Sequence, residues 1–230
     1  MNGTKNLLKQ MSLAKISKIV FSSTAATYGE PEVIPITESA KTEPTSPYGE
    51  TKLAVDQMIT EEAKTGLAAI SLRYFNVAGA FKSKCGWLAE RHNPETHLIP
   101  NLLRSTVENP IKIFGDDWPT KDGTCIRDYI HVVDLIDAHI LALESLVAGQ
   151  HKIINLGSGS GNSVAEVISA ATKVLGRVIP VEVASRRSGD PAVLVADISL
   201  AGQVLRWKPK HDIEKMVSDT WESANAENSK

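Results

Sequence analysis

The sequence predicts an α/β protein whose core is a doubly wound parallel sheet, joined to a smaller α/β domain. Short apolar runs alternate with longer segments of helical periodicity along most of the 230 residues. The apolar runs at 18–22 and 68–75 are separated by a loop and a helix, and such a long crossover joins parallel strands. Apolar residues make up 42% and charged residues 23%, which is ordinary for a globular chain and argues against wholesale disorder.

The first half of the chain predicts two helix–strand units. An amphipathic helix at the start places Leu7, Leu8 and Met11 on one face. A second helix begins near Pro47, because proline suits a first helical turn, and ends near Gly66. In chain order we expect a helix, a strand, a polar loop, a helix and a strand at residues 1–14, 18–22, 28–47, 47–66 and 68–75.

The second half alternates less regularly between strands and helices. We expect a helix over 97–107 that is broken at Pro100, and a well-formed helix over 133–147. One face of the latter carries its large apolar residues, Ile136, Ile140, Leu143 and Val147. The remaining elements are strands at 111–114, 126–132, 151–155 and 179–183, a helix at 163–175 and a polar frayed tail at 223–230.

Charge and cysteine content exclude several classes of protein. A net charge of −2, from 25 basic and 27 acidic residues, argues against nucleic acid or an anionic membrane as partner. No apolar run approaches the roughly 20 residues of a membrane helix, and the start of the chain does not have the pattern of a secretory signal. Cys85 and Cys125 alone predict neither a disulfide framework nor a structural zinc site, so we expect a reducing, cytoplasmic location.

Tyr48 and Lys52 form a Tyr-x-x-x-Lys pair at the start of a predicted helix. Residues four apart share a helical face, so the ammonium can lie near the phenol. A nearby cation favours the phenolate and would suit Tyr48 to acid–base work near neutral pH. The alternative is a surface tyrosine and lysine that merely share a face.

Thr24 follows the predicted strand at 18–22. A hydroxyl at the carboxyl end of a parallel strand lies at the ligand-binding edge of an open α/β sheet. Thr24 could therefore hydrogen-bond a substrate hydroxyl on which Tyr48 acts. In isolation, the Ser-Ser-Thr cluster also suits a turn cap.

Several further strings occur in a fixed order across roughly residues 2–222. They are FSSTAATYG at 21–29, SPYG at 46–49, LRYFNVAG at 72–79, HLIP at 97–100, IFG at 113–115, DGTCIRDYIHV at 122–132, NLG at 155–157 and RRSGD at 186–190. Together with Thr24, Tyr48 and Lys52, they make the chain resemble the extended short-chain dehydrogenase/reductases. Within that family it resembles the UDP-glucose 4-epimerases.

The resemblance implies a partial Rossmann-like NAD-binding domain over 1–80, with a return strand and helix at about 126–148, and a mainly UDP-sugar-binding domain over 81–230. It implies NAD as cofactor and interconversion of UDP-glucose and UDP-galactose at C4 through a 4-keto sugar, in galactose metabolism. It also raises a homodimer as the assembly to test. By residue match, the catalytic group is Thr24, Tyr48 and Lys52. The cofactor contacts are Tyr48, Lys52 and Tyr74. The substrate contacts are Thr24, Asn76, His97, Leu98, Ile113, Phe114, Arg127, Arg187 and Asp190.

Two details refine the reaction class that the resemblance implies. Similar 4,6-dehydratases carry an Asp-Glu pair after the threonine, whereas Thr24 is followed by Ala25 and Ala26, which cannot transfer protons. Similar enzymes also place a bulky residue near Leu194 that limits N-acetyl sugars, so we expect a preference for UDP-glucose and UDP-galactose.

The glycine-rich segment 156–163 superficially resembles a dinucleotide-binding turn, but Asn162 stands where its third glycine would be, and we expect a helix cap. His92 and His97 are five apart, which does not align two ligands on a helix, so we predict no metal site.

The family's N-terminal pyrophosphate loop has no counterpart in the sequence. We therefore expect the strand at 18–22 to have an open edge, and the isolated chain to express poorly or bind NAD weakly. A monomer with stoichiometric NAD would contradict this. Two other readings stay open: a non-catalytic UDP-sugar-binding fragment, or a related enzyme such as a UDP-pentose 4-epimerase.

Overall fold

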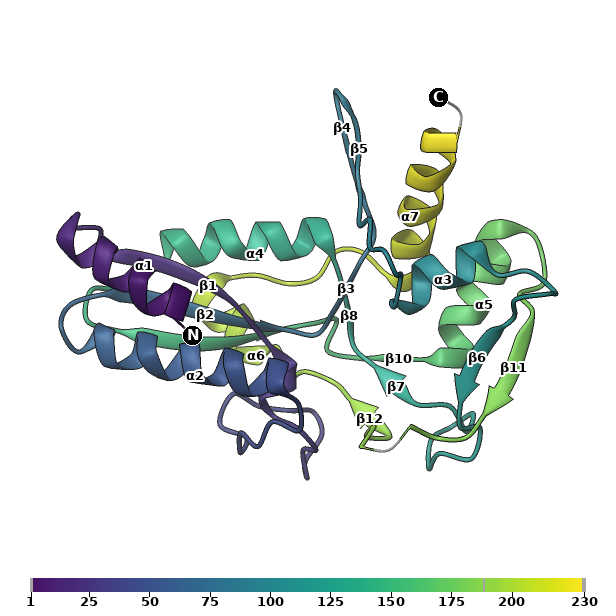
Figure 1. Ribbon diagram of the computed structural model, residues 1–230, viewed down its shortest axis with the longest axis horizontal. Helices are drawn as coiled ribbons and strands as arrows, with labels where there is room; N and C mark the ends of the chain where they lie inside the picture. Colours follow the sequence, from purple (N-terminus) through teal and green to yellow (C-terminus); the bar gives the residue numbers. More distant parts are fainter. Residues whose placement is uncertain (1, 188, 229–230) are drawn as a thin grey trace.

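A three-stranded parallel sheet in the order β1-β2-β9 organises the first part of the molecule (Figure 1). The computed structural model describes residues 2–187 and 189–228. The sheet consists of β1 (Lys18–Thr24), β2 (Ala68–Tyr74) and β9 (His151–Leu156). Their register pairs Phe21 with Ser71 and Ser71 with Ile153, so all three strands end at the same edge. The predicted parallel sheet is confirmed.

Helices cover both faces of this sheet. Figure 1 shows α2 (Pro47–Ala63) and α4 (Val132–Glu144) on opposite sides of β1 and β2. The α4 side, with α6 (Ser199–Leu205), holds a core that includes Leu72, Ile154 and Trp207. The α2 side holds a smaller core. Helix α1 (Asn2–Leu13) lies beside α2, and β2 is the one strand partner of β1 among the described residues, so β1 has the expected open edge.

A buried ion pair fixes α2 against the sheet. Arg73 of β2 donates from Nε and Nη2 to Asp56 Oδ2 of α2, both at 3.0 Å. Ser23 of β1 donates to the same oxygen at 3.0 Å. All three residues are buried, and a buried charge is tolerated only when it is paired in this way. The network therefore holds the helix that carries Tyr48 and Lys52 in register with β1 and β2.

The second part of the molecule has its own core. Helices α3 (Leu98–Arg104), α5 (Val164–Leu175) and α7 (Ile213–Asn228) pack together, and β6 (Ile111–Phe114) pairs in parallel with β11 (Val181–Ala184) beside them (Figure 1). Short strands lie between the two parts: β3 (Asn76–Ala78) with β8 (Tyr129–His131), and β7 (Ile126–Arg127) with β10 (Asn162–Ser163) and β12 (Val193–Leu194). The hairpin of β4 (Phe81–Ser83) and β5 (Gly86–Leu88) projects away from both parts (Figure 1).

Three predicted elements are wrong in detail. Pro100 does not break a helix, because α3 begins at Leu98 and the proline lies in its first turn, where no backbone donor is lost. The strand expected over 126–132 is divided at Asp128 into β7 and β8. Residues 223–228 belong to α7 rather than to a frayed tail, because Met216 and Val217 bury that helix in the second core; residues 229–230 lie outside the described residues.

Of the two predicted apolar helix faces, the one on α4 is exposed and the one on α1 is buried only in part. Ile136, Ile140 and Leu143 share one side of α4 and are about half exposed, while the sheet side of α4 is lined by Leu135, Ala138 and Ala142. On α1, Leu8 and Met11 are buried but Leu7 is exposed. Ala138 and Ala142 on the sheet side allow α4 to approach the sheet closely. No helix among the described residues is long and apolar enough to cross a membrane.

Candidate active site

A cavity of about 1530 Å³ lies where the carboxyl ends of β1 and β2 meet the second part of the molecule. Its wall takes residues from both parts, including Thr24, Tyr48 and Tyr74 on one side and Phe114 and Arg187 on the other. Open α/β sheets bind ligands at this edge. The fold therefore brings the two groups of predicted residues to one cavity.

Thr24 occupies the end of β1 and begins a short 3-10 helix, η1 (Ala25–Thr27). Its Oγ1 accepts a hydrogen bond from Ala26 N at 3.2 Å, so the predicted turn cap is present. The residue is only 8% exposed, yet it lines the cavity. Cap and cavity wall are compatible, because a hydroxyl can accept one hydrogen bond and donate another.

Tyr48 is the second residue of α2 and also lines the cavity. Helix α2 begins next to η1 because Gly49 lets the two backbones meet, where a Cβ would overlap the carbonyl of Ala26. Ser46 caps the helix by accepting a hydrogen bond from Gly49 N at 3.2 Å. The helix start and the strand end therefore place Tyr48 and Thr24 on the same wall.

Lys52 lies one turn along α2, behind Tyr48. Its Nζ is 5.7 Å from the centroid of the Tyr48 ring and donates to Ser22 O at 2.7 Å. Burial lowers the pKa of Lys52, against an opposite pull from the negative charge of Asp56. The expected proximity of ammonium and phenol ring is confirmed. Lys52 itself is absent from the wall of the cavity, so within this structure it contacts the site through Tyr48 and the β1 backbone.

A second tyrosine, Tyr129 on β8, also lines the cavity and has a different environment. Burial raises its pKa to about 12, so it stays neutral near pH 7. Tyr48 is 55% exposed and has a lysine beside its ring. Of these two phenols, Tyr48 is therefore the one placed for proton transfer.

Arginine and aromatic side chains gather on the far wall of the cavity. The guanidinium of Arg187 stacks over the Phe114 ring, with Cζ 3.8 Å from the ring centroid. Arg127 donates from Nη1 to Ile126 O and Pro191 O, both at 2.9 Å, and its Nη2 lies 3.9 Å from Asp190 Oδ2. A fixed guanidinium is suited to binding phosphate.

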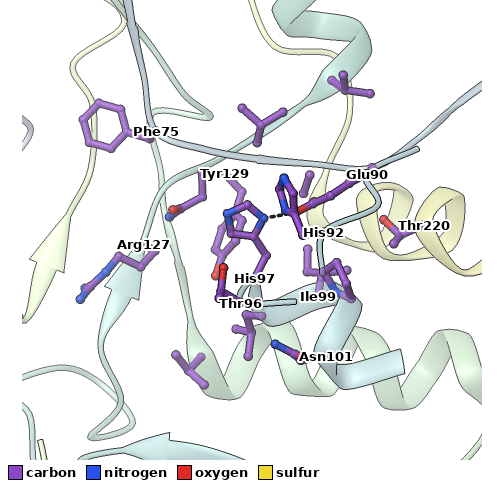
Figure 2. A pocket seen from close by; sticks show the side chains of 18 of the residues that line it. Phe75, Glu90, His92, Thr96, His97, Ile99, Asn101, Arg127, Tyr129 and Thr220 are labelled. Carbon is purple, nitrogen blue, oxygen red and sulfur yellow. Dashed lines mark hydrogen bonds and ion pairs between the residues drawn. The ribbon is translucent and has the colours of Figure 1, made fainter. Parts of the chain in front are cut away.

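Most of the remaining predicted contacts also reach the cavity. Asn76, His97 and Leu98 line it, and Figure 2 shows His97 and Arg127 projecting from different elements around it. Asn76 is held by its Nδ2, which donates to Asp128 O at 3.1 Å. Ile113 is not on the wall, although its strand neighbours Lys112 and Phe114 are.

Leu194 also lies off the wall, in β12 opposite Arg127, so the cavity geometry lends no support to it as a gate for sugar size.

The glycine-rich turn after β9 surrounds a buried carboxylate. Asp128 accepts hydrogen bonds from Ser158 N at 2.5 Å, Ser158 Oγ at 2.6 Å, Gly159 N at 3.1 Å and Ala196 N at 3.0 Å. The amides that a phosphate would need are thus already used. Ser163 caps α5 in a capping box with Glu166, as expected of this segment.

Sequence reasoning missed the roles of Asp56 and Asp128 as buried anchors. Each lies inside an otherwise ordinary pattern, a helix for Asp56 and a strand for Asp128. The only available signal was a charged residue at an apolar position of that pattern.

Comparisons with known proteins agree with this geometry. The model of the NAD dependent epimerase/dehydratase family matches residues 1–157. The chain belongs to this family.

The proteins that the chain resembles carry a name more specific than that of the family. The chain is 53% identical over 224 residues to a UDP-glucose 4-epimerase of Corynebacterium glutamicum, a match that covers 96% of this chain and 67% of the relative. It superposes with a TM-score of 0.92 at 39% identity on a UDP-glucose-4-epimerase from Stenotrophomonas maltophila with bound NAD and formylated UDP-arabinopyranose, covering 99% of this chain and 69% of that one.

A UDP-glucose 4-epimerase from Bifidobacterium longum, in complex with NAD+ and UDP, superposes with a TM-score of 0.87 at 38% identity, over 97% and 68% of the two chains. The chain thus spans about two thirds of the length of the relatives it matches.

The described residues fit one end of NAD and not the other. Tyr48 and Tyr74 line the open cavity, where a nicotinamide ring and its ribose have room, and Lys52 lies behind them. The turn that follows β9 is filled by Asp128, so it does not cradle the pyrophosphate. Within residues 2–187 and 189–228, the fit is therefore limited to the nicotinamide side.

Proposed function

We propose that this chain carries the catalytic residues and the UDP-sugar-binding wall of an enzyme that interconverts UDP-glucose and UDP-galactose at C4, in galactose metabolism. The observation that carries the proposal is that Thr24 and Tyr48 line one cavity, with Lys52 5.7 Å from the Tyr48 ring. The family and the names of the relatives support the same activity.

Each of the three residues has a role that follows from its position. Tyr48 takes the proton of the sugar 4-hydroxyl and later returns it. The Lys52 ammonium favours the negative form of the phenol while that proton is absent. Thr24, which has one side engaged with the Ala26 amide, uses its hydroxyl to orient the sugar hydroxyl toward Tyr48. Bound beside Tyr48 and Tyr74, NAD would supply the hydride acceptor and donor that a change of configuration at C4 requires.

The far wall would hold the nucleotide. Arg127 and Arg187 bring two cations to a cavity that must bind a diphosphate, and both guanidinium groups are already oriented by carbonyls or by a ring. Asp190 accompanies Arg127 at 3.9 Å and would accept hydrogen bonds from ligand hydroxyl or N–H groups. Dehydration across the sugar ring is disfavoured, because Ala25 and Ala26 offer no acid or base after Thr24.

A second candidate function is binding of UDP-sugars without catalysis. It is favoured by one observation, the Asp128 carboxylate that occupies the glycine-rich turn and leaves it no free amides for a pyrophosphate. Calorimetric titration of the chain with UDP, with and without NAD, separates the two functions. Catalysis predicts that NAD binds and changes UDP affinity, whereas simple binding predicts a UDP response that NAD leaves unchanged.

The decisive experiment is an assay of UDP-galactose conversion by this chain, and by the chain fused to the third of the Corynebacterium glutamicum relative that it does not match. Tyr48→Phe should lower the turnover of the active form about 1,000-fold, the usual size of an acid–base contribution. UDP affinity should be unchanged. Thr51→Ala, on the exposed side of the same helix, is the matched control. Substantial turnover by Tyr48→Phe would contradict the assignment.

Sugar preference and assembly follow as finer parts of the proposal. We expect UDP-glucose and UDP-galactose to be converted faster than their N-acetyl counterparts. This expectation rests on the family resemblance and not on Leu194, which lies off the cavity wall. Comparable turnover would contradict it. A homodimer is the expected assembly, which sedimentation of the chain at several concentrations tests.

A further inference from the structure

The segment between β5 and α3 collects four side chains with metal-binding donors. Residues 89–97 form an irregular loop, and it carries Glu90, His92, Glu95 and His97. One ligand atom from each residue lies within 4.8 Å of the others. Figure 2 shows the two imidazole rings beside Glu90 at the edge of the cavity.

The two histidines converge on one carboxylate oxygen. His92 Nδ1 is 2.6 Å from Glu90 Oε1, and His97 Nδ1 is paired with the same oxygen. Both Nδ1 atoms also face Glu95 Oε1, at 3.9 and 4.0 Å. The rings meet edge to face with centroids 5.1 Å apart. The donor atoms therefore point inward to one small volume.

Glu95 supplies an independent observation. Its side chain is only 3% exposed, and its Oε1 accepts hydrogen bonds from Thr96 N at 2.8 Å and His97 N at 2.9 Å. Its Oε2 is buried and has no hydrogen-bond partner, one of two such side-chain atoms among the described residues. The other, Asp56 Oδ1, belongs to a carboxylate that Arg73 neutralises through its second oxygen. An unpartnered buried carboxylate oxygen is costly, and a bound cation would remove the cost.

We propose that Glu90, His92, Glu95 and His97 bind one divalent transition-metal ion, of which Zn²⁺ is the best match. Two imidazole nitrogens and two carboxylates form a donor set that Zn²⁺ accepts in tetrahedral geometry, with ligand bonds of about 2.0–2.2 Å. Mg²⁺ and Ca²⁺ prefer an all-oxygen set. The exposed histidine rings leave the site accessible to the ion from solvent.

The spacing argument against a metal at His92 and His97 applies only to a helix. In this loop the chain turns back between the two residues, so a separation of five positions brings their rings into contact. Glu90, His92 and His97 also line the main cavity. The site shares His97 with the predicted substrate contacts, but none of its evidence involves Tyr48, Lys52 or NAD, so metal binding can be tested without the proposed catalysis.

The test is metal binding by the chain alone, without NAD or nucleotide. After removal of metals with a chelator, titration with Zn²⁺ should show one ion bound per chain, and Co²⁺ should produce the intense visible bands of four-coordinate cobalt. Mg²⁺ should not compete. Glu95→Gln and His92→Asn should each weaken Zn²⁺ binding at least about 10-fold. Glutamine retains the acceptor for the Thr96 and His97 amides, so the loop should keep its shape.

Glu182→Gln, an exposed residue of β11, is the matched control and should leave the affinity unchanged. Circular dichroism confirms that each variant is folded. Binding of less than one ion per chain would overturn the proposal. Affinity that neither Glu95→Gln nor His92→Asn changes would overturn it as well, because the ion would then lie elsewhere.

Discussion

Two turns on either side of β2 show how similar local patterns acquire different roles. Both follow a parallel strand and precede a helix: η1 after β1, and the glycine-rich turn after β9. In the first, Thr24 and the nearby Tyr48 face the cavity. In the second, the backbone amides of Ser158 and Gly159 are occupied by Asp128. Both turns lie at the same edge of the sheet. They differ in whether the chain's own side chains already hydrogen-bond to the polar groups of the turn.

A carboxylate anchors each turn, and the two anchors bind different donors. Asp56 pairs with the charged Arg73 and holds the middle of α2 against the sheet. Asp128 instead accepts hydrogen bonds from three backbone amides and one hydroxyl. Asp56 holds side chains of α2 and β2 together and leaves the turn after β1 free. Asp128, in contrast, binds the backbone amides of the turn after β9.

The largest expected effect comes from emptying the glycine-rich turn. Asp128→Ala removes the acceptor of four hydrogen bonds and leaves buried donors unpaired, at about 1–3 kcal/mol for each that water cannot reach. We expect a loss of about 4 kcal/mol in the free energy of unfolding, measured by urea denaturation. Asp116→Ala, at an exposed position, should change it by no more than about 0.5 kcal/mol. A loss below about 1 kcal/mol would show that the turn is held by other contacts.

The next prediction concerns Lys52 and the pH dependence of stability. Burial lowers the pKa of Lys52 in the folded chain, so the unfolded chain binds more protons at pH values between the folded and unfolded pKa. Stability from this group therefore rises as the pH increases through that window toward the ordinary lysine value. Lys52→Met should remove that rise.

Parallel denaturation curves at several pH values up to the alkaline range measure the effect. Lys64→Met, on the exposed end after α2, is the control and should leave the wild-type slope in place. A steeper rise in Lys52→Met than in the wild type would reverse the sign and contradict the burial of the ammonium.

Much of the fold could be predicted from the sequence because alternating strands and amphipathic helices are local patterns. The ends of β2, β6 and α5 agree with their predictions to within one or two residues. The pair proposed for catalysis was likewise a local pattern, since Tyr48 and Lys52 are one helical turn apart.

Long-range packing decided what could not be predicted. The side of α4 that carries Ile136 and Ile140 is the more apolar one, yet the sheet accepts the small residues of the opposite side. The convergence of Glu90 with His97 depends on the path of a loop, which no periodicity encodes.

The smallest expected effects concern the N-terminal caps of α2 and α5, the helices that follow the two turns. Ser46 makes one capping hydrogen bond, to Gly49 N, so Ser46→Ala should cost about 1 kcal/mol of unfolding free energy. Ser163 accepts from Glu166 N at 3.0 Å and donates to Asp122 Oδ2 at 2.5 Å, so Ser163→Ala should cost more, about 2 kcal/mol. Ser46→Ala should also lower turnover, because the Ser46 cap positions Tyr48. Ser163→Ala should leave turnover unchanged once the protein is folded. Equal losses of turnover in the two variants would mean that both turns support the catalytic wall.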